Sequence, residues 1–195
     1  TGTRTCTITL NVPATVVPSI TSVTVEDTVT TVATRIGAYV KSLSKLSVAI
    51  TAAGSNGSTV SSYRTSLDGV TYTTASFTAS KRLSAAGNLT LTVTVTDSRG
   101  RTATYTETLT VLDYSYPSIR LFKADRCNAD GSAAQVDGTH VRYSFEGGVV
   151  PLNNKNALAC VVYYKLASAE TWTQAETLSV TSYNLSETDK VLTQT

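Results

Sequence analysis

The side chains that could carry out chemistry are few in this sequence and widely spaced. His140 is the single histidine, and it follows Gly138-Thr139 at the start of an alternating run. A nucleophilic triad or a zinc site needs histidine together with partner residues. The sequence has no Gly-rich phosphate loop, no cysteine and histidine cluster and no catalytic pair of carboxylates. We therefore expect a protein that is not an enzyme and that holds no cofactor and no metal.

Two groups of acidic residues have part of the composition of a cation site. Residues 128–131 contain Asn, Asp and Gly as a calcium loop does, but Arg126 stands where the first carboxylate ligand is needed. A turn between strands explains the same residues. Glu26, Asp27 and Asp113 lie near expected domain ends, where they are too sparse to clamp calcium. Both groups are interpreted as turn and strand-end residues.

Arg99 and an aromatic group are the candidates for ligand contact. Arg99 lies in a turn of Asp, Ser and Gly residues, so its place is also explained by hairpin geometry. Tyr163, Tyr164 and Trp172 form the aromatic group, whose faces could pack on the apolar faces of a sugar. The alternative is core packing, because Trp172 corresponds to Tyr72 in an internal repeat of the chain. A position that holds an aromatic residue in both copies suggests packing in a core.

Three cysteines, Cys6, Cys127 and Cys160, are present. An odd number at wide spacing is not typical of a disulfide framework. We expect reduced and mostly buried thiols. A bridge between Cys127 and Cys160 is the alternative, and it would need an oxidising compartment.

Strands, not helices, must position these residues. Threonine is frequent and favours strands, and 41% of the residues are hydrophobic, which is enough for a core. Leu89 to Thr96 alternates apolar and polar residues without error, and a turn then leads into a second alternating run, Ala103 to Val111. These runs predict a long β-hairpin. Glu107 interrupts its apolar face and is expected near an edge or an end.

Shorter strands are expected elsewhere, and Val29 to Val40 could hold a short helical turn. The charged fraction of 15% and the net charge of +2 give no electrostatic case for a nucleic-acid partner. No run of eighteen apolar residues occurs, so no membrane insertion is expected. The shorter strands are predicted near residues 20–25, 45–51, 59–65, 71–73, 119–124, 139–145, 158–166, 171–174 and 177–183.

A repeat with a period of about 99 residues divides the chain. Residues 18–20 (Pro-Ser-Ile) recur at 117–119, and Leu10-Asn11-Val12 recurs as Leu109-Thr110-Val111. A third match links Tyr63-Arg64 to Tyr164-Lys165. The repeat predicts three segments: 1–17, the last strand of a preceding repeat plus a linker; 18–113, a complete immunoglobulin-like sandwich; and 114–195, a second such sandwich that is incomplete at its C-terminal end.

The run Val93 to Thr104, with its Thr-Asp-Ser-Arg-Gly-Arg core, resembles minor structural proteins of siphophages of Gram-positive bacteria. The segments 112–119, 41–46, 63–72 and 126–139 share this resemblance, which covers most of the chain. It implies an all-β chain of tandem immunoglobulin-like or fibronectin type III-like sandwiches in a tail-tip, fibre or baseplate protein. It implies no enzymatic activity and no assigned binding residues.

The expected function is therefore that of a structural spacer module in a phage tail appendage that supports host attachment. Its expected partners are other virion tail proteins, with host cell-surface saccharide and a homo-oligomer in the virion as further expectations. The protein would be made in the bacterial cytoplasm and located in the virion. A carbohydrate- or host-surface-binding module, or a domain of a bacterial surface adhesin, is the alternative.

Overall fold

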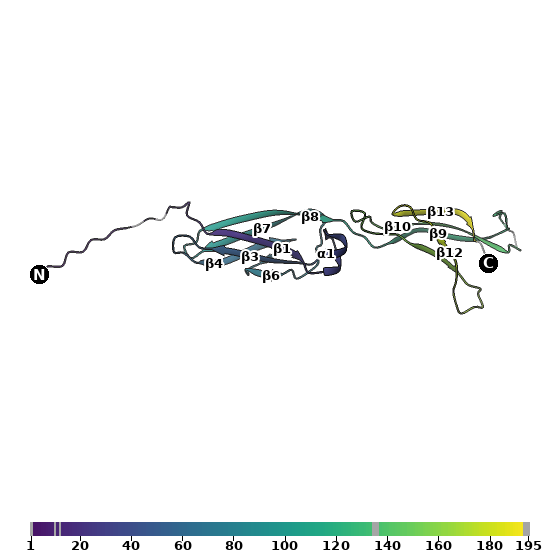
Figure 1. Cartoon of the computed structure of the whole chain (residues 1–195), viewed down its shortest axis with the longest axis horizontal. Helices are drawn as coiled ribbons and strands as arrows, with labels where there is room; N and C mark the ends of the chain where they lie inside the picture. The colour runs from purple at the N-terminus through teal and green to yellow at the C-terminus, as the bar shows by residue number, and fades with distance from the viewer. Residues whose placement is uncertain (1, 10, 12, 134–136, 193–195) are drawn as a thin grey trace. The chain divides into compact units, whose positions relative to one another are not determined.

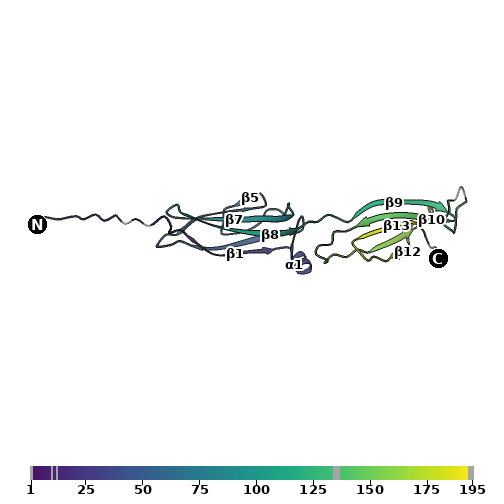
Figure 2. The same cartoon turned by 90° about the horizontal axis from the view of Figure 1, so that it is seen from above.

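The computed structural model of the protein describes residues 2–9, 11, 13–133 and 137–192. The chain forms two compact units, Thr1–Leu112 and Asp113–Thr195, which are drawn in two views in Figure 1 and Figure 2. The described residues are mostly in strands, with one short helix, so the prediction of an all-β chain is confirmed. None of the helical structure in these ranges has the length and apolar character needed to cross a membrane.

The first unit is a sandwich of two sheets. The three-stranded sheet has the antiparallel order β1-β3-β6. The five-stranded sheet has the order β2-β8-β7-β4-β5, in which β2 runs parallel to β8. The strands are β1 (Ser19–Asp27), β2 (Tyr39–Val40), β3 (Leu46–Ala53), β4 (Val60–Leu67), β5 (Val70–Tyr72), β6 (Ser76–Thr78), β7 (Gly87–Asp97) and β8 (Thr102–Leu112).

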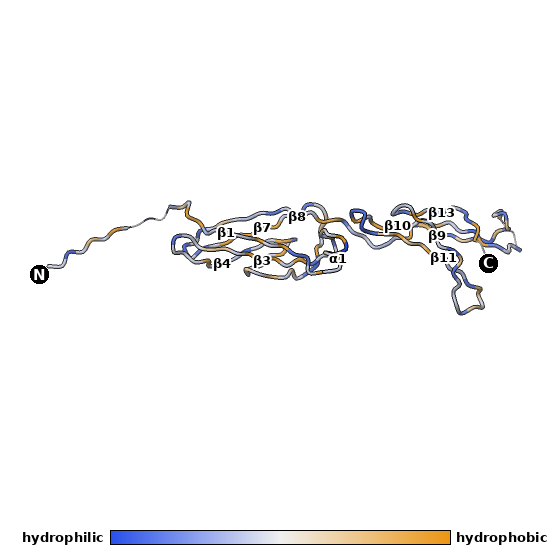
Figure 3. Tube along the Cα trace, viewed as in Figure 1, coloured by the Kyte–Doolittle hydropathy of each residue, from blue (hydrophilic) through white to orange (hydrophobic). Residues whose placement is uncertain are grey.

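The core of this unit follows from the alternation seen in the sequence. Leu91, Val93 and Val95 of β7 are fully buried, while the threonines between them lie on the other face of the sheet. Apolar residues of β3 pack against them from the facing sheet, and Figure 3 shows the hydropathy along both strands. The predicted hairpin is present, with β7 and β8 paired from Gly87↔Val111 to Thr96↔Thr102.

Glu107 lies near a sheet edge, as expected. It is opposite Leu91 in the β7–β8 register and is half-buried. The outer neighbour of β8 is β2, which pairs only with Val111 and Leu112. The Glu107 carboxylate accepts a hydrogen bond of 3.0 Å from the Tyr105 hydroxyl, which satisfies a charge on an otherwise apolar face.

The ambiguous stretch after β1 contains the single helix of the described residues, α1 (Thr30–Ile36). Val32 is its buried residue. Gly37 ends the helix in the left-handed conformation with φ of 67°, and its N–H donates to the Ala33 carbonyl. Such an ending is common because glycine has no Cβ to oppose a positive φ.

The second unit has two smaller sheets. The order β13-β10-β9 forms one, and β11-β12 forms the other. The prediction of two short strands at 171–174 and 177–183 is wrong, because one strand runs through residues 173–178 and the next begins at Asn184. The β11–β12 ladder contains a bulge at the step from Val162 to Tyr163. The bulge shifts the pairing, so β12 remains one strand although its apolar–polar alternation is broken. The strands are β9 (Ser118–Cys127), β10 (His140–Gly148), β11 (Cys160–Tyr164), β12 (Thr173–Leu178) and β13 (Asn184–Val191).

The segment before β1 forms no strand in its described residues. Leu10 and Val12, which carry part of the predicted repeat, lie outside the described residues. A strand requires a neighbour to pair with, so the assignment of residues 1–17 to a preceding module stays a prediction. The end of this segment is attached to the first unit, because Arg101 Nη1 donates to the Val16 carbonyl at 2.8 Å.

Candidate functional site

The three aromatic candidates do not share one surface. Tyr163 and Tyr164 are consecutive in β11, so their side chains point to opposite faces of the strand. Tyr163 is 52% exposed and Trp172, just before β12, is 64% exposed, whereas Tyr164 is half-buried. Tyr163 and Trp172 are therefore available to a ligand, and Tyr164 is less so.

Core packing of Trp172 is the wrong interpretation. Tyr72 is half-buried and stacks on Phe77, with ring centroids 3.9 Å apart and planes 7° apart. Trp172 is exposed, and the ammonium group of Lys165 lies 5.4 Å from its ring centroid, which is the geometry of a cation–π contact. The two positions differ because Tyr72 is paired with buried Thr65, whereas Trp172 precedes the first paired residue of its strand, Thr173.

Arg99 is used within the first unit. Its guanidinium donates to the backbone carbonyls of Ser55, at 3.0 Å, and Asn56, so it joins the β7–β8 turn to the β3–β4 turn. Asp97 shapes its turn, with Oδ1 accepting N–H bonds of 2.9 Å from Arg99 and from Arg101. Burial alone would raise the pKa of Asp97, but these bonds outweigh it and lower the pKa. The turn interpretation therefore explains Arg99.

Arg99→Ala is expected to destabilise the first unit by about 0.5–1.5 kcal/mol, because two hydrogen bonds to backbone carbonyls are lost. Thermal and urea unfolding followed by circular dichroism would measure the change. Arg64→Ala, on the exposed face of β4, is the matched control and should change the stability less. An equal effect of both substitutions would show that the contacts of Arg99 contribute nothing specific.

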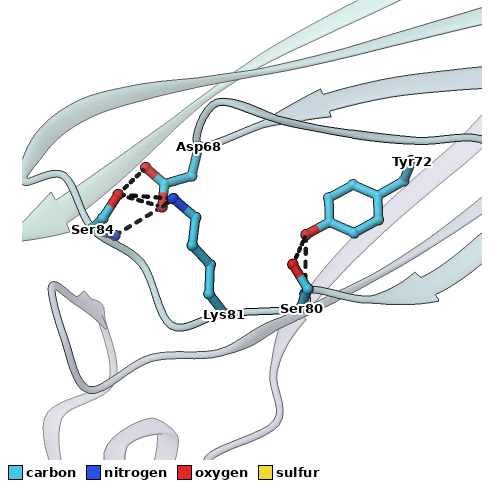
Figure 4. Close-up of polar contacts among 5 residues, drawn as sticks. All are labelled: Asp68, Tyr72, Ser80, Lys81 and Ser84. Atoms are coloured by element: carbon cyan, nitrogen blue, oxygen red, sulfur yellow. Dashed lines mark hydrogen bonds and ion pairs between the residues drawn. The ribbon is translucent and has the colours of Figure 1, made fainter.

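A second polar cluster holds the segment that follows β6 (Figure 4). The Asp68 carboxylate, in the turn between β4 and β5, accepts bonds from the N–H of Ser84 at 2.8 Å and from its hydroxyl at 2.9 Å. Lys81 Nζ lies 3.4 Å from the same carboxylate, and the Ser80 N–H donates to the Tyr72 hydroxyl at 3.0 Å. Burial alone would raise the pKa of Asp68, but these partners outweigh it and lower the pKa. The carboxylate stabilises a loop.

The residues considered for calcium have structural contacts as well. Asp27 Oδ1 accepts from the N–H of Val29 at 3.0 Å and of Lys45 at 3.1 Å. Asp130 Oδ1 accepts from the N–H of Ser132 at 2.9 Å, which closes a turn. Within residues 2–133 and 137–192, less 10 and 12, no group of three or more His, Cys, Asp or Glu could hold a metal ion.

His140 begins β10, and its Nδ1 lies 2.9 Å from the Thr139 hydroxyl. The three cysteines are free thiols: Cys127 is buried, Cys160 is half-buried and Cys6 is exposed. Burial, with the charge of Glu187, raises the pKa of Cys160. A raised pKa keeps the thiol protonated, which disfavours a nucleophilic role.

A cavity in the second unit is the feature that the sequence reasoning missed. Its volume is about 470 Å³, and it lies among β9, β10 and β11. Ile119 and Phe122 of β9 line it and are 71% and 65% exposed. Their positions in the repeat match Ile20 and Val23, which pack against the core of the first unit. That correspondence was the available signal that these side chains belong to an interior.

A polar contact joins the two sheets of the second unit. The buried Tyr143 hydroxyl, from β10, donates to Glu176 Oε1 of β12 at 2.8 Å. Lys190 Nζ, from β13, lies 2.8 Å from the other carboxylate oxygen. Burial raises the pKa of Tyr143, and its bond to Glu176 raises it further. These three residues stabilise the packing of β12 over the sheet.

Comparison with known proteins gives one family. Residues 1–141 match the family described as "Siphovirus protein of unknown function (DUF859)". The matched range covers all of the first unit, β9 and the start of β10. No curated protein matches the chain, and no solved structure matches it.

Proposed function

The chain belongs to this family of siphovirus proteins, and from that premise we propose that it is a non-enzymatic structural module of a phage tail appendage. Family membership indicates a phage structural protein associated with the virion. One structural observation carries the proposal further. The strand order β1-β3-β6 with β4-β5 in the first unit recurs as β9-β10-β13 with β11-β12 in the second. A repeated strand order indicates similar modules arranged in series along the chain, which is the arrangement that a spacer would need.

Within this proposal, each unit is an immunoglobulin-like or fibronectin type III-like module. The first unit supports this assignment, because its three-stranded sheet has the order of strands A, B and E. Its larger sheet contains the order G, F, C, C′, which is also that of such sandwiches. β2, which lies between β1 and β3 in the chain, pairs in parallel with β8 and forms a short edge strand of the larger sheet.

The mechanism of such a module is mechanical. The hydrogen-bonded ladder of β7 and β8 runs from Gly87↔Val111 to Thr96↔Thr102, and each strand has 11 residues. At roughly 3.4 Å per residue, such a strand spans ~37 Å. Modules in series, joined by short linkers that contain proline, would hold a host-binding tip away from the virion. Other tail proteins are the proposed partners, and a homo-oligomer is the proposed state in the virion.

A second candidate function is favoured by the exposure of Trp172 and Tyr163. Exposed aromatic rings are suited to stacking on the apolar faces of a host saccharide, and Trp172 also has the Lys165 ammonium group beside it. The module would then contact the host surface itself. Membership of a siphovirus family counts against the remaining alternative, a bacterial surface adhesin.

Gold-labelled antibody against the purified chain, applied to intact phage that encodes it, tests the tail assignment by electron microscopy. Label on the tail tip or fibres is the expected result. Label on the capsid, or on lysed host cells but not on virions, would contradict the proposal. Light scattering of the purified chain would show whether this segment forms oligomers alone.

Adsorption assays separate the spacer from the binding module. A spacer added as purified chain is expected to leave phage adsorption to host cells unchanged. A binding module would compete, and Trp172→Ala would abolish that competition. Tyr116→Ala removes an exposed aromatic ring elsewhere in the second unit and serves as the matched control. Competition that needs Trp172 and not Tyr116 would replace the spacer proposal by the binding proposal.

A further inference from the structure

The second unit presents an apolar face that in the first unit lies inside the sandwich. Phe122 and Phe145 are directly paired in the β9–β10 ladder, so their side chains are on one face of that sheet. Tyr143 shares this face, two residues along β10. The cavity of about 470 Å³ lies over this face, and Cys160 and Val162 of β11 line it from the other sheet.

The same face is covered in the first unit. Ile20 and Val23 of β1, at the repeat positions of Ile119 and Phe122, pack against the buried cluster. That cluster includes Leu109 and Val111 of β8, and β8 is in contact with β1. The apolar face of β1 is therefore covered by β8, the last strand of the first unit.

The strand correspondence shows which elements cover the first unit, and these elements have no counterpart among the described residues of the second. β9, β10, β11, β12 and β13 follow the order of β1, β3, β4, β5 and β6. In the first unit the next elements are β7 and β8. These two strands pair with each other, and β7 also pairs with β4. In the described part of the second unit, β11 pairs only with β12, so its other edge has no strand neighbour.

We propose that this face and the free edge of β11 bind an antiparallel strand pair equivalent to β7–β8, supplied by the same polypeptide beyond residue 195 in a longer protein. The strand next to β11 would carry alternating branched apolar residues, as β7 does with Leu91, Val93 and Val95. Its partner would lie over Ile119 and Phe122. The addition completes a sheet through backbone hydrogen bonds and closes the cavity with side chains.

A second copy of this chain is the competing occupant. Its N-terminal segment has the Thr-rich alternation of β8 and an exposed Ile8, so it could add one strand in trans. One strand would satisfy the edge of β11 but would leave the second position empty. The strand pair of the same polypeptide fills both positions, and it needs no second molecule.

The test compares the 195-residue chain with a longer natural chain that adds a stretch as long as Ala79 to Leu112. The readout is the reaction of Cys160 with a water-soluble thiol reagent, in a Cys6→Ser background; Cys127 is buried. We expect the longer chain to react at least roughly tenfold more slowly, because labelling would then require a local opening. Equal rates in both chains would overturn the proposal.

Two residues of β9 give a matched pair of substitutions. Phe122 and Leu121 are both exposed apolar residues, on opposite faces of the strand. In the longer chain, Phe122→Asn should restore the labelling rate of the short chain, and Leu121→Asn should not. A similar effect of both substitutions would show that the added residues do not use this face, which would overturn the proposal.

Light scattering and labelling of the 195-residue chain distinguish the competing occupant. The proposal predicts a monomer whose Cys160 stays reactive at all protein concentrations. A dimer that protects Cys160, and that loses this protection when residues 1–13 are removed, would show that a second copy covers the face. That result would overturn the proposal and leave the tail assignment untouched.

Discussion

Leu91→Ala is expected to lower the free energy of unfolding of the first unit by about 3 kcal/mol, with a fall in Tm of roughly 10 °C or more. Leu91 has 0% exposure in β7, which lies between β8 and β4 in the larger sheet. Its side chain packs in the cluster between the two sheets. The smaller side chain leaves a cavity there, and the lost contacts are not replaced by water. Calorimetry and urea unfolding would measure the change.

Thr90→Ala is the matched control, because Thr90 is adjacent and lies on the exposed face of the same strand. Its effect should stay within about 1 kcal/mol, the span of strand propensities. Equal losses for Leu91 and Thr90 would contradict the assignment of one buried face to β7. A loss at Leu91 alone would also show that strict alternation in this sequence reports burial.

The strands that could be predicted are those whose local pattern agrees with their tertiary position. Leu89 to Thr96 has one apolar face, and Asp97 supplies the acceptor that shapes the following turn. Both signals are local, so the β7–β8 hairpin is visible in the sequence. The repeat adds long-range information, because each Pro-Ser-Ile triplet marks the start of the first strand of a unit. The serine of the triplet is the first strand residue, Ser19 in β1 and Ser118 in β9.

The elements that could not be predicted depend on partners far away in the chain. β6 has three residues, and β13 is mostly polar because it is an edge strand. Each is a strand because it pairs with the central strand of its sheet, β3 or β10. The guanidinium of Arg99 likewise finds its acceptor at Ser55, in another turn. No spacing within the sequence indicates these contacts.

The exposure of Trp172 was hidden for a related reason. Its predicted match to Tyr72 in the repeat does not carry over to burial, since Tyr72 is half-buried and Trp172 is exposed. The bulge between Val162 and Tyr163 changes the register along β12, and Trp172 lies before the strand begins. Sequence periodicity assigns a face only while the ladder is regular, so a bulge removes that information.

Glu176→Ala is expected to destabilise the second unit by about 1–3 kcal/mol, because it leaves the buried Tyr143 hydroxyl without an acceptor. The carboxylate also pairs with Lys190, so the change removes a contact between three strands. Glu176→Gln keeps an acceptor for the hydroxyl and should cost less. Tyr143→Phe combined with Glu176→Ala should cost less than the sum of the single changes, since the two residues share one bond.

The pH dependence gives the same contact a second test. Burial alone would raise the pKa of Glu176, but bonds from Lys190 and Tyr143 and the charge of Lys190 outweigh it and lower the pKa below 4.5. A lowered folded-state pKa means that the stabilisation is present above pH 4.5 and is lost as the pH falls through the lowered value. The second unit should therefore lose stability in acid, and Glu176→Gln should show a flatter profile there. Parallel profiles for the two proteins would show that the carboxylate is not the titrating group, and the sheets would then be joined by apolar packing around Tyr143 instead.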